Sequence, residues 1–315
     1  MINFVNIVFS SDDNYAQHTA VAMASILLNT SNPAKVRFFI IDDGISEDKK
    51  SKIKSTADNL RSTVEFITVK NTELMEGFVS GEISRACYYR IDIPNILPLD
   101  VEKVIYLDCD LLLYDDIQIL WETNIGQYPI AAVCDYGIMA SKRLRRQKAE
   151  YIGLPAQADY FNSGVLVMNL EVWRKADYSS KVIDVVKNNR FPNHDQDALN
   201  QVFMNNWYVL PLRWNVIPPV FNLFVKILKN KLMRENAIEA KKNPAIFHYA
   251  GGYKAWEYRL YQGFNDRYYK YLATTAFSDA VMPQPDKRRK NRSIKRQIVR
   301  LKIADILAEC FSLVF

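Results

Sequence analysis

Two carboxylates, those of Asp108 and Asp110, interrupt the apolar run KVIYLDCDLLLY at residues 103–114. The run has the composition of a buried β-strand, in which side chains two positions apart point to the same side. The two carboxylates are therefore expected to project together. Ionised groups in apolar surroundings are costly unless something pairs with them, so two like charges this close must share either a proton or a cation.

A shared proton and a shared cation predict different chemistry. A proton-sharing pair is typical of a protease or a glycoside hydrolase, but a glycoside hydrolase needs its two carboxylates on opposite sides of the scissile bond. Two adjacent carboxylates on one strand do not meet that requirement, which makes a divalent cation the simpler partner. Oxygen ligands suit Mg²⁺ or Mn²⁺, and an added imidazole favours Mn²⁺.

Three histidines, His18, His194 and His248, are available to supply that imidazole. His18 falls in the middle of a predicted helix and is better explained as a packed or surface residue. His248 ends an apolar strand and precedes the sequence GGYK, in which Gly251 would let the backbone approach an anion and Lys254 would neutralise it. In isolation this short motif is a weak signal, and a core histidine beside an ordinary turn explains it better.

The elements that must position these residues alternate between strand and helix in the first third of the chain. Apolar and β-branched runs predict strands at 4–10, 36–42, 63–69, 103–114 and 129–135. Helices are predicted at 15–30 and, after an N-cap at Ser46, at 47–60. This alternation indicates an α/β fold with a mostly parallel, doubly wound sheet, whose ligands bind beyond the carboxyl ends of the strands.

The later segments are less regular. Residues 159–173 predict a loop, a strand and a turn, and residues 194–206 begin a helix with acidic residues in its first turn. Residues 246–256 predict a short strand that enters the Gly-Gly loop. Pro283 and Pro285 then separate this body from a basic tail.

The net charge of +6 belongs to the tail and not to the body. Nine Lys or Arg and two acidic residues lie between Lys287 and the C-terminus, which leaves residues 1–286 with a net charge of −1. A nucleic-acid-binding body would show a basic face, so we expect no nucleic-acid partner.

The four cysteines form no CxxC pair, which favours free thiols in a reducing cytoplasm. The N-terminal segment is too polar for a signal peptide or a membrane span, and we expect neither there.

Five blocks of sequence occur in an order that resembles glycosyltransferase family 8: FSSDDNY, YLDCD, FNSGVLVMNL, HDQDALN and HYAGGYKAW. These are retaining transferases with a GT-A fold, and the chain resembles the bacterial members that add galactose or glucose to lipooligosaccharide. One DxD motif is a poor signal, but five ordered blocks over residues 4–275 are a strong one. The resemblance implies a Rossmann-like GT-A catalytic domain at 1–282 and a basic amphipathic helical tail at 283–315. Its nucleotide-sugar half would span about 1–135 and its later motifs about 136–282.

The resemblance also implies roles for individual residues. Asp108, Asp110 and His248 would hold Mn²⁺, with Mg²⁺ as a substitute, and the metal would bridge the diphosphate of a UDP-hexose. Asp135 would face the incoming acceptor. The other residues implied to contact the donor are Ser10, Asp12, Asn14 and Tyr15 around the uridine, Gly251 and Lys254 at the phosphates, Arg90 beside the donor, and Asn162, Ser163, Asp195 and Gln196 around the hexose.

By the same resemblance, Gln196, Asp195 and Asp135 line the reacting centre. Similar enzymes retain the anomeric configuration without a well-placed carboxylate nucleophile, so we expect the acceptor hydroxyl to attack from the leaving-group face. Gln196 is a poor nucleophile and is assigned positioning only. The metal and Lys254 would stabilise the charge that develops on the departing UDP.

Three positions depart from the family's pattern. Glu82 stands where relatives often carry a histidine, Ser163 replaces a common alanine, and Tyr253 is bulky for the phosphate loop. The first departure leaves the preference for acceptor and hexose open, and the other two do not touch the metal ligands.

Several alternatives remain at this stage. The donor is either UDP-galactose or UDP-glucose, because both need the same uridine, phosphate and metal contacts. A protein-directed or self-glycosylating transferase of the glycogenin kind has the same fold and would label itself without an acceptor. A basic-tailed nucleic-acid-binding or membrane-scaffold protein with a vestigial site would show substitutions at the metal positions, and none is present. The run KRLRRQK at 142–148 fits a solvated helix face better than a contact for a phosphorylated acceptor.

The tail has the composition of a membrane-surface anchor. Nine basic residues and no acidic residue lie between Lys287 and Lys302, each adding about 1 kcal/mol of attraction to an anionic bilayer. Acidic residues such as Asp305 and Glu309 prevent the following apolar stretch from spanning a membrane. Residues spaced alternately by four and three form its apolar helical face: Val299, Ile303, Ile306, Cys310 and Leu313.

We therefore expect a cytoplasmic enzyme, peripheral on the inner face of the cell membrane, whose saccharide acceptor is lipid-linked. The alternative for the tail is a helix that packs back on the body or on another subunit.

Deleting residues 287–315 should abolish binding to anionic vesicles and leave transfer to a soluble acceptor analogue intact, because the attraction comes from the basic and apolar tail residues. Co-flotation with vesicles, measured at low and high salt, checks this, and binding of the intact protein should weaken as salt rises. A truncated protein that still floats with vesicles contradicts the assignment.

Overall fold

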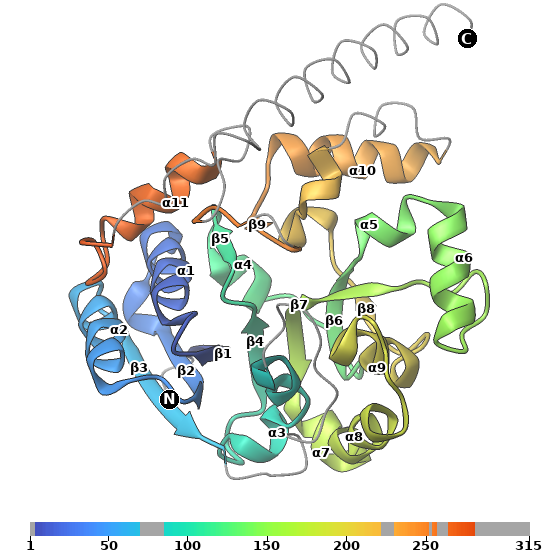
Figure 1. Cartoon of the computed structure of the whole chain (residues 1–315), viewed down its shortest axis with the longest axis horizontal. Helices are drawn as coiled ribbons and strands as arrows, with labels where there is room; N and C mark the ends of the chain where they lie inside the picture. The colour runs from blue at the N-terminus through green and yellow to red at the C-terminus, as the bar shows by residue number, and fades with distance from the viewer. Residues whose placement is uncertain (1–3, 70–84, 222–229, 252–253, 257–263, 281–315) are drawn as a thin grey trace, which may run out of the picture.

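Long apolar runs that alternate with helices build one central sheet. The computed structural model describes residues 4–69, 85–221, 230–251, 254–256 and 264–280. Within these residues the strands pair in the order β3-β2-β1-β4-β7-β6-β8 (Figure 1). Their bounds are β1 Val5–Asp12, β2 Val36–Asp43, β3 Thr63–Thr68, β4 Lys103–Leu107, β6 Ile130–Cys134, β7 Phe161–Asn169 and β8 Tyr208–Val209.

The predicted α/β fold with a mostly parallel sheet is confirmed. β1 pairs in parallel with β2 and β4, β2 with β3, and β6 with β8. The exception is β7, which runs antiparallel to both of its neighbours, β4 and β6. Because β7 runs the opposite way, its first residues, near Asn162, lie beside the carboxyl end of β4.

The helices cover both faces of this sheet. Their bounds are α1 Ala16–Asn29, α2 Glu47–Asn59, α3 Ile93–Ile96, α4 Ile117–Trp121, α5 Tyr136–Met139, α6 Lys142–Tyr151, α7 Leu170–Ala176, α8 Tyr178–Asn188, α9 His194–Val202, α10 Lys231–Lys242 and α11 Phe264–Leu272. Short 3₁₀ helices occur at Pro33–Lys35 (η1), Arg85–Ile91 (η3), Leu212–Asn215 (η4) and Pro218–Phe221 (η5). The predicted helices at 15–30, 47–60 and 194–206 therefore form as α1, α2 and α9, with small shifts at their ends.

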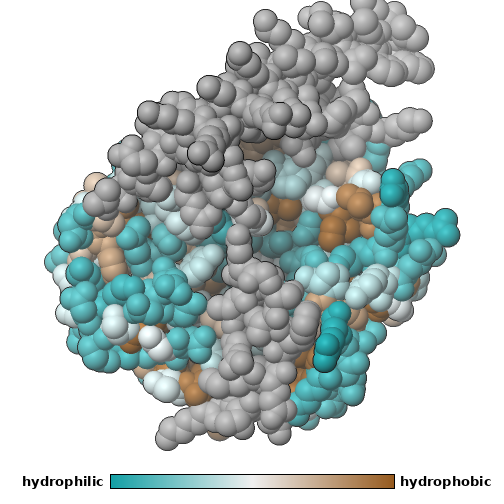
Figure 2. Space-filling model, viewed as in Figure 1, coloured by the Kyte–Doolittle hydropathy of each residue, from teal (hydrophilic) through white to brown (hydrophobic). Residues whose placement is uncertain are grey.

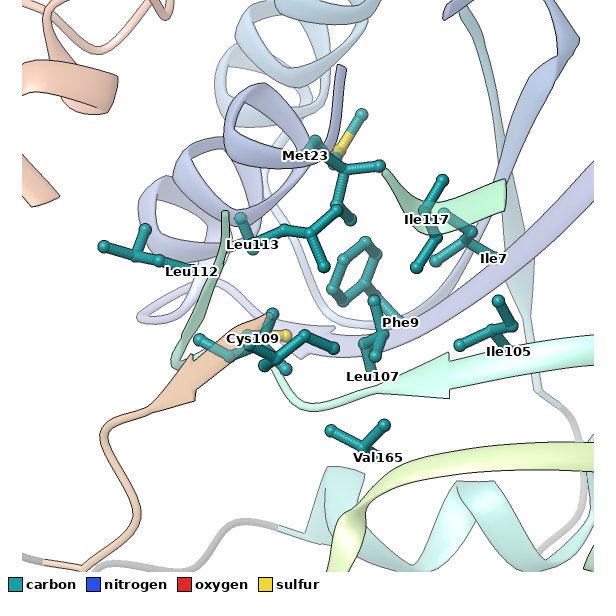
Figure 3. Close-up of a cluster of buried hydrophobic side chains, with 14 of the residues drawn as sticks. Ile7, Phe9, Met23, Ile105, Leu107, Cys109, Leu112, Leu113, Ile117 and Val165 are labelled. Atoms are coloured by element: carbon teal, nitrogen blue, oxygen red, sulfur yellow. The ribbon is translucent and has the colours of Figure 1, made fainter. Parts of the chain in front are cut away.

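Two apolar clusters fill the two faces. On one face, Phe9 of β1 and Leu107 of β4 pack with Met23 of α1 (Figure 3). On the other face, Val8 of β1 packs in a cluster that includes Trp173 of α7. Strands covered on both sides need apolar residues at nearly every position, which is why the central runs are continuous in the sequence.

The surface of the molecule is mixed in polarity on the face that Figure 2 shows. Figure 2 shows hydrophilic side chains over α2 and α6, with apolar side chains gathered near α5. Among the residues that the structure describes, no helix is long and apolar enough to cross a membrane. The predicted tail at 283–315, as well as Glu82 and Tyr253, lies outside the described residues.

The predicted strand at 103–114 is divided in two, which corrects the sequence prediction. β4 ends at Leu107, and β5 (Leu111–Leu113) leaves the central sheet to pair antiparallel with β9 (Ile246–His248). Asp108 and Asp110 therefore lie in the bend between two strands. A continuous apolar ladder would offer buried carboxylates no partners, whereas the bend exposes them to side chains from other parts of the chain.

A single side chain binds the segment that leads into β4. Arg174 of α7 donates hydrogen bonds to five backbone carbonyl groups of the segment before β4. The acceptors are the carbonyl groups of Pro94, Leu97, Pro98, Leu99 and Val101. A guanidinium has five N–H donors in a fixed fork, and no other side chain can satisfy so many carbonyls at once. This contact holds the segment that precedes β4, which begins at Lys103.

Replacing Arg174 with Met should lower the free energy of unfolding by about 1.5–3 kcal/mol, the net value of hydrogen bonds to a charged group. Urea denaturation monitored by tryptophan fluorescence measures the change. The matched control is Lys175→Met, which removes an exposed charge from the same helix and should cost no more than about 0.5 kcal/mol. Equal losses in the two variants would show that the carbonyl contacts do not matter.

Candidate active site

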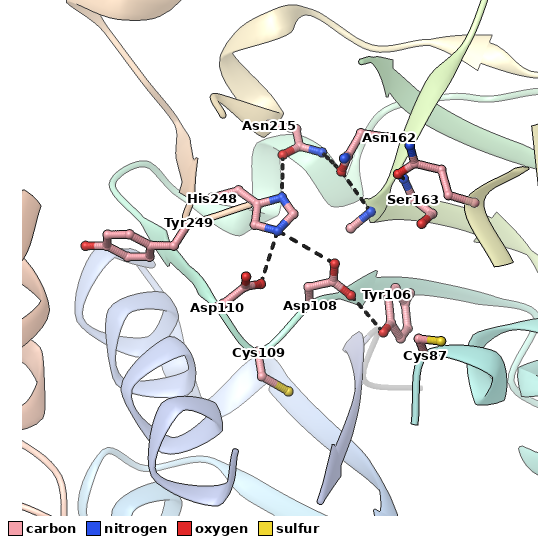
Figure 4. Close-up of polar contacts among 12 residues, drawn as sticks. Cys87, Tyr106, Asp108, Cys109, Asp110, Asn162, Ser163, Asn215, His248 and Tyr249 are labelled. Carbon is pink, nitrogen blue, oxygen red and sulfur yellow. Dashed lines mark hydrogen bonds and ion pairs between the residues drawn. The ribbon is translucent and has the colours of Figure 1, made fainter. Parts of the chain in front are cut away.

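Three side chains of metal-ligand type meet between β4 and β9. One ligand atom from each of Asp108, Asp110 and His248 lies within 4.8 Å of the others (Figure 4). His248 Nε2 is 3.1 Å from Asp110 Oδ1 and 3.7 Å from Asp108 Oδ2. The register of the second sheet explains the meeting, because it pairs His248 with Leu111, the residue after Asp110.

The cluster also depends on a glycine in β7. The Asp108 N–H donates to the carbonyl of Gly164 at 2.9 Å, so the two backbones are in direct contact. A Cβ atom at Gly164 would lie 2.6 Å from Asp108 Oδ2 and would also overlap the His248 ring. A glycine inside a strand often marks such a close approach, and this signal was present in the block FNSGVLVMNL.

Side chains distant in the sequence neutralise both carboxylates. Arg90 lies 2.9 Å from Asp108 Oδ1, and the Lys254 ammonium forms an ion pair with Asp110. Arg90 also bridges to Asp195, with 3.1 Å between Nε and Oδ2. The sequence segment around the two carboxylates contains no base after Lys103, so local reading of the sequence missed these partners.

The local charges shift the titration of the buried groups. Burial alone would raise the pKa of Asp110, but His248 and Lys254 outweigh it and hold that pKa well below its usual range. Burial opposes a charged imidazole at His248, but Asp110 and Asp108 outweigh it and raise the pKa of His248. Burial raises the pKa of Asp195, with Arg90 opposing and Asp108 adding to the shift. Asp110 is therefore a carboxylate at neutral pH despite its burial.

The donor set fits a divalent cation. His248 Nδ1 lies 3.0 Å from Asn215 Oδ1, and Asn215 in turn donates its Nδ2 to Asn162 Oδ1 at 2.8 Å. This second bond turns the Asn215 oxygen toward the imidazole, so Nδ1 carries the hydrogen and Nε2 is left as a ligand atom. Two carboxylates with one oriented imidazole can hold such an ion.

The residues expected around the hexose are brought together beside the cluster. Ser163 Oγ donates to Asp195 Oδ2 at 3.2 Å, and the Ser163 N–H donates to Gln196 Oε1 at 3.0 Å. Asp135 Oδ2 accepts from Asn162 at 3.4 Å and from Gln196 at 3.2 Å. All five side chains are nearly buried. Asp135 follows β6 as the N-cap of α5, and β7 and α9 supply the other four, so the structure joins three separate segments of the sequence.

The residues expected around the uridine lie where β1 meets α1. Asp12 Oδ1 accepts the N–H of Tyr15 at 3.0 Å, and Asn14 is exposed. Ser10 is buried and donates its hydroxyl to the carbonyl of Ala86 at 2.7 Å. The structure thus gives Asp12 and Ser10 contacts that hold the loop, while Asn14 is open to solvent.

The remaining predicted residues lie at the end of β9. Gly251 has φ of +86°, a backbone conformation that favours glycine. Lys254 donates to the Tyr249 carbonyl at 2.9 Å, in addition to its ion pair. His18 is packed, as expected: its ring stacks on Trp256 with centroids 3.6 Å apart, and burial lowers its pKa to about 3.

Sequence reasoning missed four residues that shape the site. Asn215 orients His248, and Tyr106 donates its hydroxyl to Asp108 Oδ1 at 3.0 Å. The Tyr160 hydroxyl accepts from Gln196 Nε2 at 3.0 Å, and Lys148 donates to Asp197, the next residue, at 2.8 Å. Lys148 lies in the basic run at 142–148, but nothing in the run distinguishes it, and no sequence signal marks the other three. Their positions carry ordinary residue types and become meaningful only when distant elements meet.

The family model of glycosyl transferase family 8 matches residues 6–259. The chain belongs to this family. General stress protein A of Bacillus subtilis (strain 168) is 33% identical over 286 residues, which cover 89% of this chain and 96% of that protein. Lipopolysaccharide 1,2-glucosyltransferase of Escherichia coli (strain K12) is 27% identical over 271 residues, which cover 84% and 76%.

A solved structure agrees with the family assignment. The galactosyltransferase LgtC, crystallised with donor and acceptor sugar analogs, is similar with a TM-score of 0.73 and 26% sequence identity. The similarity covers 91% of this chain and 99% of that one. The predicted GT-A fold is thereby confirmed, and as a family 8 glycosyltransferase the chain uses a nucleotide-sugar donor and a saccharide acceptor.

Asp110→Asn should lower the free energy of unfolding by about 3 kcal/mol in the presence of a chelator, because it leaves the Lys254 ammonium buried without its partner. The sequence alone, which shows no partner for Asp110, would suggest the opposite sign. Chemical denaturation measures the change. Asp115→Asn is the control: it removes the carboxylate from a more exposed ion pair, with Arg213, and should cost about 1 kcal/mol or less. A gain in stability for Asp110→Asn contradicts this account.

Proposed function

We propose that this protein transfers galactose or glucose from a UDP-sugar to a saccharide acceptor with retention of the anomeric configuration. The observation that carries the proposal is the cluster of Asp108, Asp110 and His248, which lies in a chain of glycosyl transferase family 8. A family 8 enzyme needs charge stabilisation on its leaving nucleotide, and this cluster is where a cation would supply it.

Mn²⁺ is the proposed cofactor, with Mg²⁺ as a substitute, held by Asp108, Asp110 and His248. The imidazole favours Mn²⁺, since Mg²⁺ prefers oxygen ligands alone. When bound, the ion would neutralise charge on the donor diphosphate. Arg90 remains paired with Asp108 and Asp195, so it keeps the two carboxylates in place without taking part in cation binding.

Lys254 and Gly251 are the proposed diphosphate contacts. Lys254 is held at the edge of the cluster by Asp110 and by the Tyr249 carbonyl. A phosphate oxygen of the donor could replace the Asp110 carboxylate as the negatively charged partner of the Lys254 ammonium. The positive φ of Gly251 turns the backbone at the start of this loop. Tyr15, Asp12 and Asn14 are proposed to hold the uridine.

The hexose is proposed to lie against Asn162, Ser163, Asp195 and Gln196, with Asp135 on the acceptor side. These residues line one continuous hydrogen-bonded network, which fixes their side chains before any ligand binds. Preorganised polar groups lower the cost of orienting the reactants. Gln196 is assigned positioning, since an amide is a poor nucleophile, and the acceptor hydroxyl is proposed to attack from the face that UDP leaves.

The acceptor is proposed to be a lipid-linked saccharide at the inner face of the cell membrane. Two facts support this: a relative is a lipopolysaccharide 1,2-glucosyltransferase, and the segment from residue 287 carries nine Lys or Arg. A basic segment of this kind is attracted to anionic lipids and would keep the enzyme near such an acceptor.

A donor screen tests the function. Hydrolysis of UDP-galactose, UDP-glucose and other UDP-sugars is measured with Mn²⁺, with Mg²⁺ and with a chelator, and we expect turnover of one or both hexose donors that the chelator abolishes. No metal-dependent turnover of any UDP-hexose contradicts the proposal. Incubation with labelled donor and no acceptor separates the alternative, since only a self-glycosylating enzyme would become labelled.

His248→Ala and Lys254→Ala should produce different defects. Losing the imidazole should weaken Mn²⁺ binding at least about tenfold in the absence of nucleotide, because it removes a ligand. Losing Lys254 should leave Mn²⁺ binding unchanged or tighter, because it frees Asp110 from its ion pair, while UDP binding weakens and uridine binding stays normal. Calorimetric titration of Mn²⁺, UDP and uridine separates the two.

Lys54→Ala, which removes an exposed lysine from α2, is the control and should change neither affinity. If His248→Ala and Lys254→Ala show the same pattern of losses, the separate roles proposed here are wrong.

A further inference from the structure

The side-chain amide of Gln196 is held on three sides. Its Nε2 donates to the Tyr160 hydroxyl at 3.0 Å and to Asp135 Oδ2 at 3.2 Å, and its Oε1 accepts the Ser163 N–H at 3.0 Å. Both hydrogens of the amide and one lone pair of its oxygen are thus used. Among the described residues no other group donates to Oε1, so a lone pair of that oxygen is the amide's remaining hydrogen-bonding capacity.

Tyr160, together with Asp135 and the Ser163 N–H, decides which end of the amide faces it. Its hydroxyl donates to Asp197 Oδ1 at 2.6 Å, so only the oxygen lone pairs of Tyr160 are directed at Gln196. The amide must present its N–H₂ end to these lone pairs and to the Asp135 carboxylate. The reversed amide would place its oxygen against that carboxylate and its N–H₂ group against the Ser163 N–H, which are both repulsive pairings.

Lys148 in turn holds the Asp197 carboxylate in place. Asp197 is fully buried, and both of its oxygens accept from Lys148 Nζ, at 2.8 and 3.0 Å. Asp197 Oδ2 also accepts the Asn193 N–H at 3.0 Å. A buried carboxylate held by an ammonium accepts hydrogen bonds only, which is why the Tyr160 hydroxyl must donate to it.

This contact refines the expectation for the basic run at 142–148. Lys142, Arg143 and Arg146 are exposed, as a solvated helix face requires, but the Lys148 side chain is only 12% exposed. The last residue of the run therefore belongs to the interior and connects α6 with the first turn of α9.

We infer that Tyr160 and Lys148 are positioning residues that fix the orientation of the Gln196 amide, so that Gln196 accepts a hydrogen bond from a substrate hydroxyl and cannot donate one. The chain of contacts runs from Lys148 to Asp197, from Asp197 to Tyr160 and from Tyr160 to Gln196. The inference rests on the proposed function, because it assigns the hydroxyl to the hexose or to the acceptor at that site.

The central test is a double-mutant cycle on Tyr160 and Gln196. Tyr160→Phe keeps the ring and the Lys148–Asp197 ion pair and removes only the hydroxyl, so the variant is expected to fold. Its kcat should fall roughly threefold to tenfold, the factor that corresponds to one hydrogen bond, with KM for the UDP-hexose changed by less than about twofold. In a Gln196→Ala background the same change should have no further effect on kcat.

Tyr151→Phe is the matched control. Tyr151 is exposed on α6 and its hydroxyl donates to the Arg190 carbonyl at 3.3 Å, so its removal should leave kcat and KM unchanged. A Tyr160→Phe enzyme with the kcat of the wild type overturns the inference. So does a loss of the same size in the Gln196→Ala background, because Tyr160 would then act independently of Gln196.

Lys148 is tested by substitution and rescue. Lys148→Met should lower kcat at least as much as Tyr160→Phe, and Lys148→Arg should recover most of the loss because it restores a cation beside Asp197. Arg146→Met is the control, since Arg146 is exposed on the same helix and pairs only with Glu150 among the described residues. Lys148→Gln is the uncharged comparison. If it recovers as much kcat as Lys148→Arg, the positive charge beside Asp197 is not what matters. Should Lys148→Met not fold, Tyr160→Phe carries the test alone.

A spectroscopic readout separates this inference from the proposed function. In protein with ¹⁵N-labelled glutamine, the side-chain amide signals of Gln196 are identified by their absence in Gln196→Ala. They should shift in Tyr160→Phe and stay unchanged in Tyr151→Phe. If the wild type turns over no UDP-hexose, the proposed function fails, but the shift of the Gln196 amide signals in Tyr160→Phe still tests whether Tyr160 positions Gln196. If the Gln196 signals do not shift in Tyr160→Phe, the inference is overturned whatever the activity.

Discussion

The balance of charge around Asp110 is the interaction on which the site depends. A carboxylate this deeply buried is tolerated only because Lys254 and His248, from the far end of the chain, reach it. Both partners are carried by β9 and the loop after it, and β9 is held by its pairing with β5. The second sheet therefore anchors the late segments of the chain to the bend in which the carboxylates lie.

Close backbone approach is the second constraint, and it follows from the first. For His248 and Asp108 to come within reach of each other, β7 must pass beside them without a side chain, which Gly164 allows. The antiparallel course of β7 then brings Asn162 and Ser163 to the same edge of the sheet as Asp108. One reversed strand thus joins the cation cluster to the residues proposed to hold the hexose.

The polar groups of the site are linked rather than independent. Arg90 contacts Asp108 and Asp195, so the cluster and α9 share one cation. Asn162 connects His248, through Asn215, with Asp135. Such a network is favourable only when its members are satisfied, and a change at one residue alters the orientation of others several ångströms away. Preorganisation of this kind suits a reaction in which the enzyme positions substrates and stabilises charge.

The sequence by itself determined the α/β class, the strands and helices of the first third, and the family, since periodicity and ordered motifs are local properties of the chain. It also selected Asp108 and Asp110, because two carboxylates inside an apolar run are unusual enough to be noticed, whereas His248 was selected only through the resemblance to the family. It did not determine the break between β4 and β5 or the antiparallel direction of β7: an apolar run has no mark that says which strand it pairs with.

Only the tertiary structure decided which charges meet. Arg90 and Lys254 were expected beside the donor, but their pairing with Asp108 and Asp110 is visible only in the structure. Asn215, Tyr160 and Lys148 are ordinary residues in their own segments, and hydrogen bonds to distant partners give them their roles. Lys148 illustrates the reason, since Lys142, Arg143 and Arg146 of the same run are exposed and nothing in the sequence distinguishes Lys148 from them. Its position on the inward side of α6, opposite a buried Asp197, follows from how two helices pack, and packing is not encoded in the spacing of one segment.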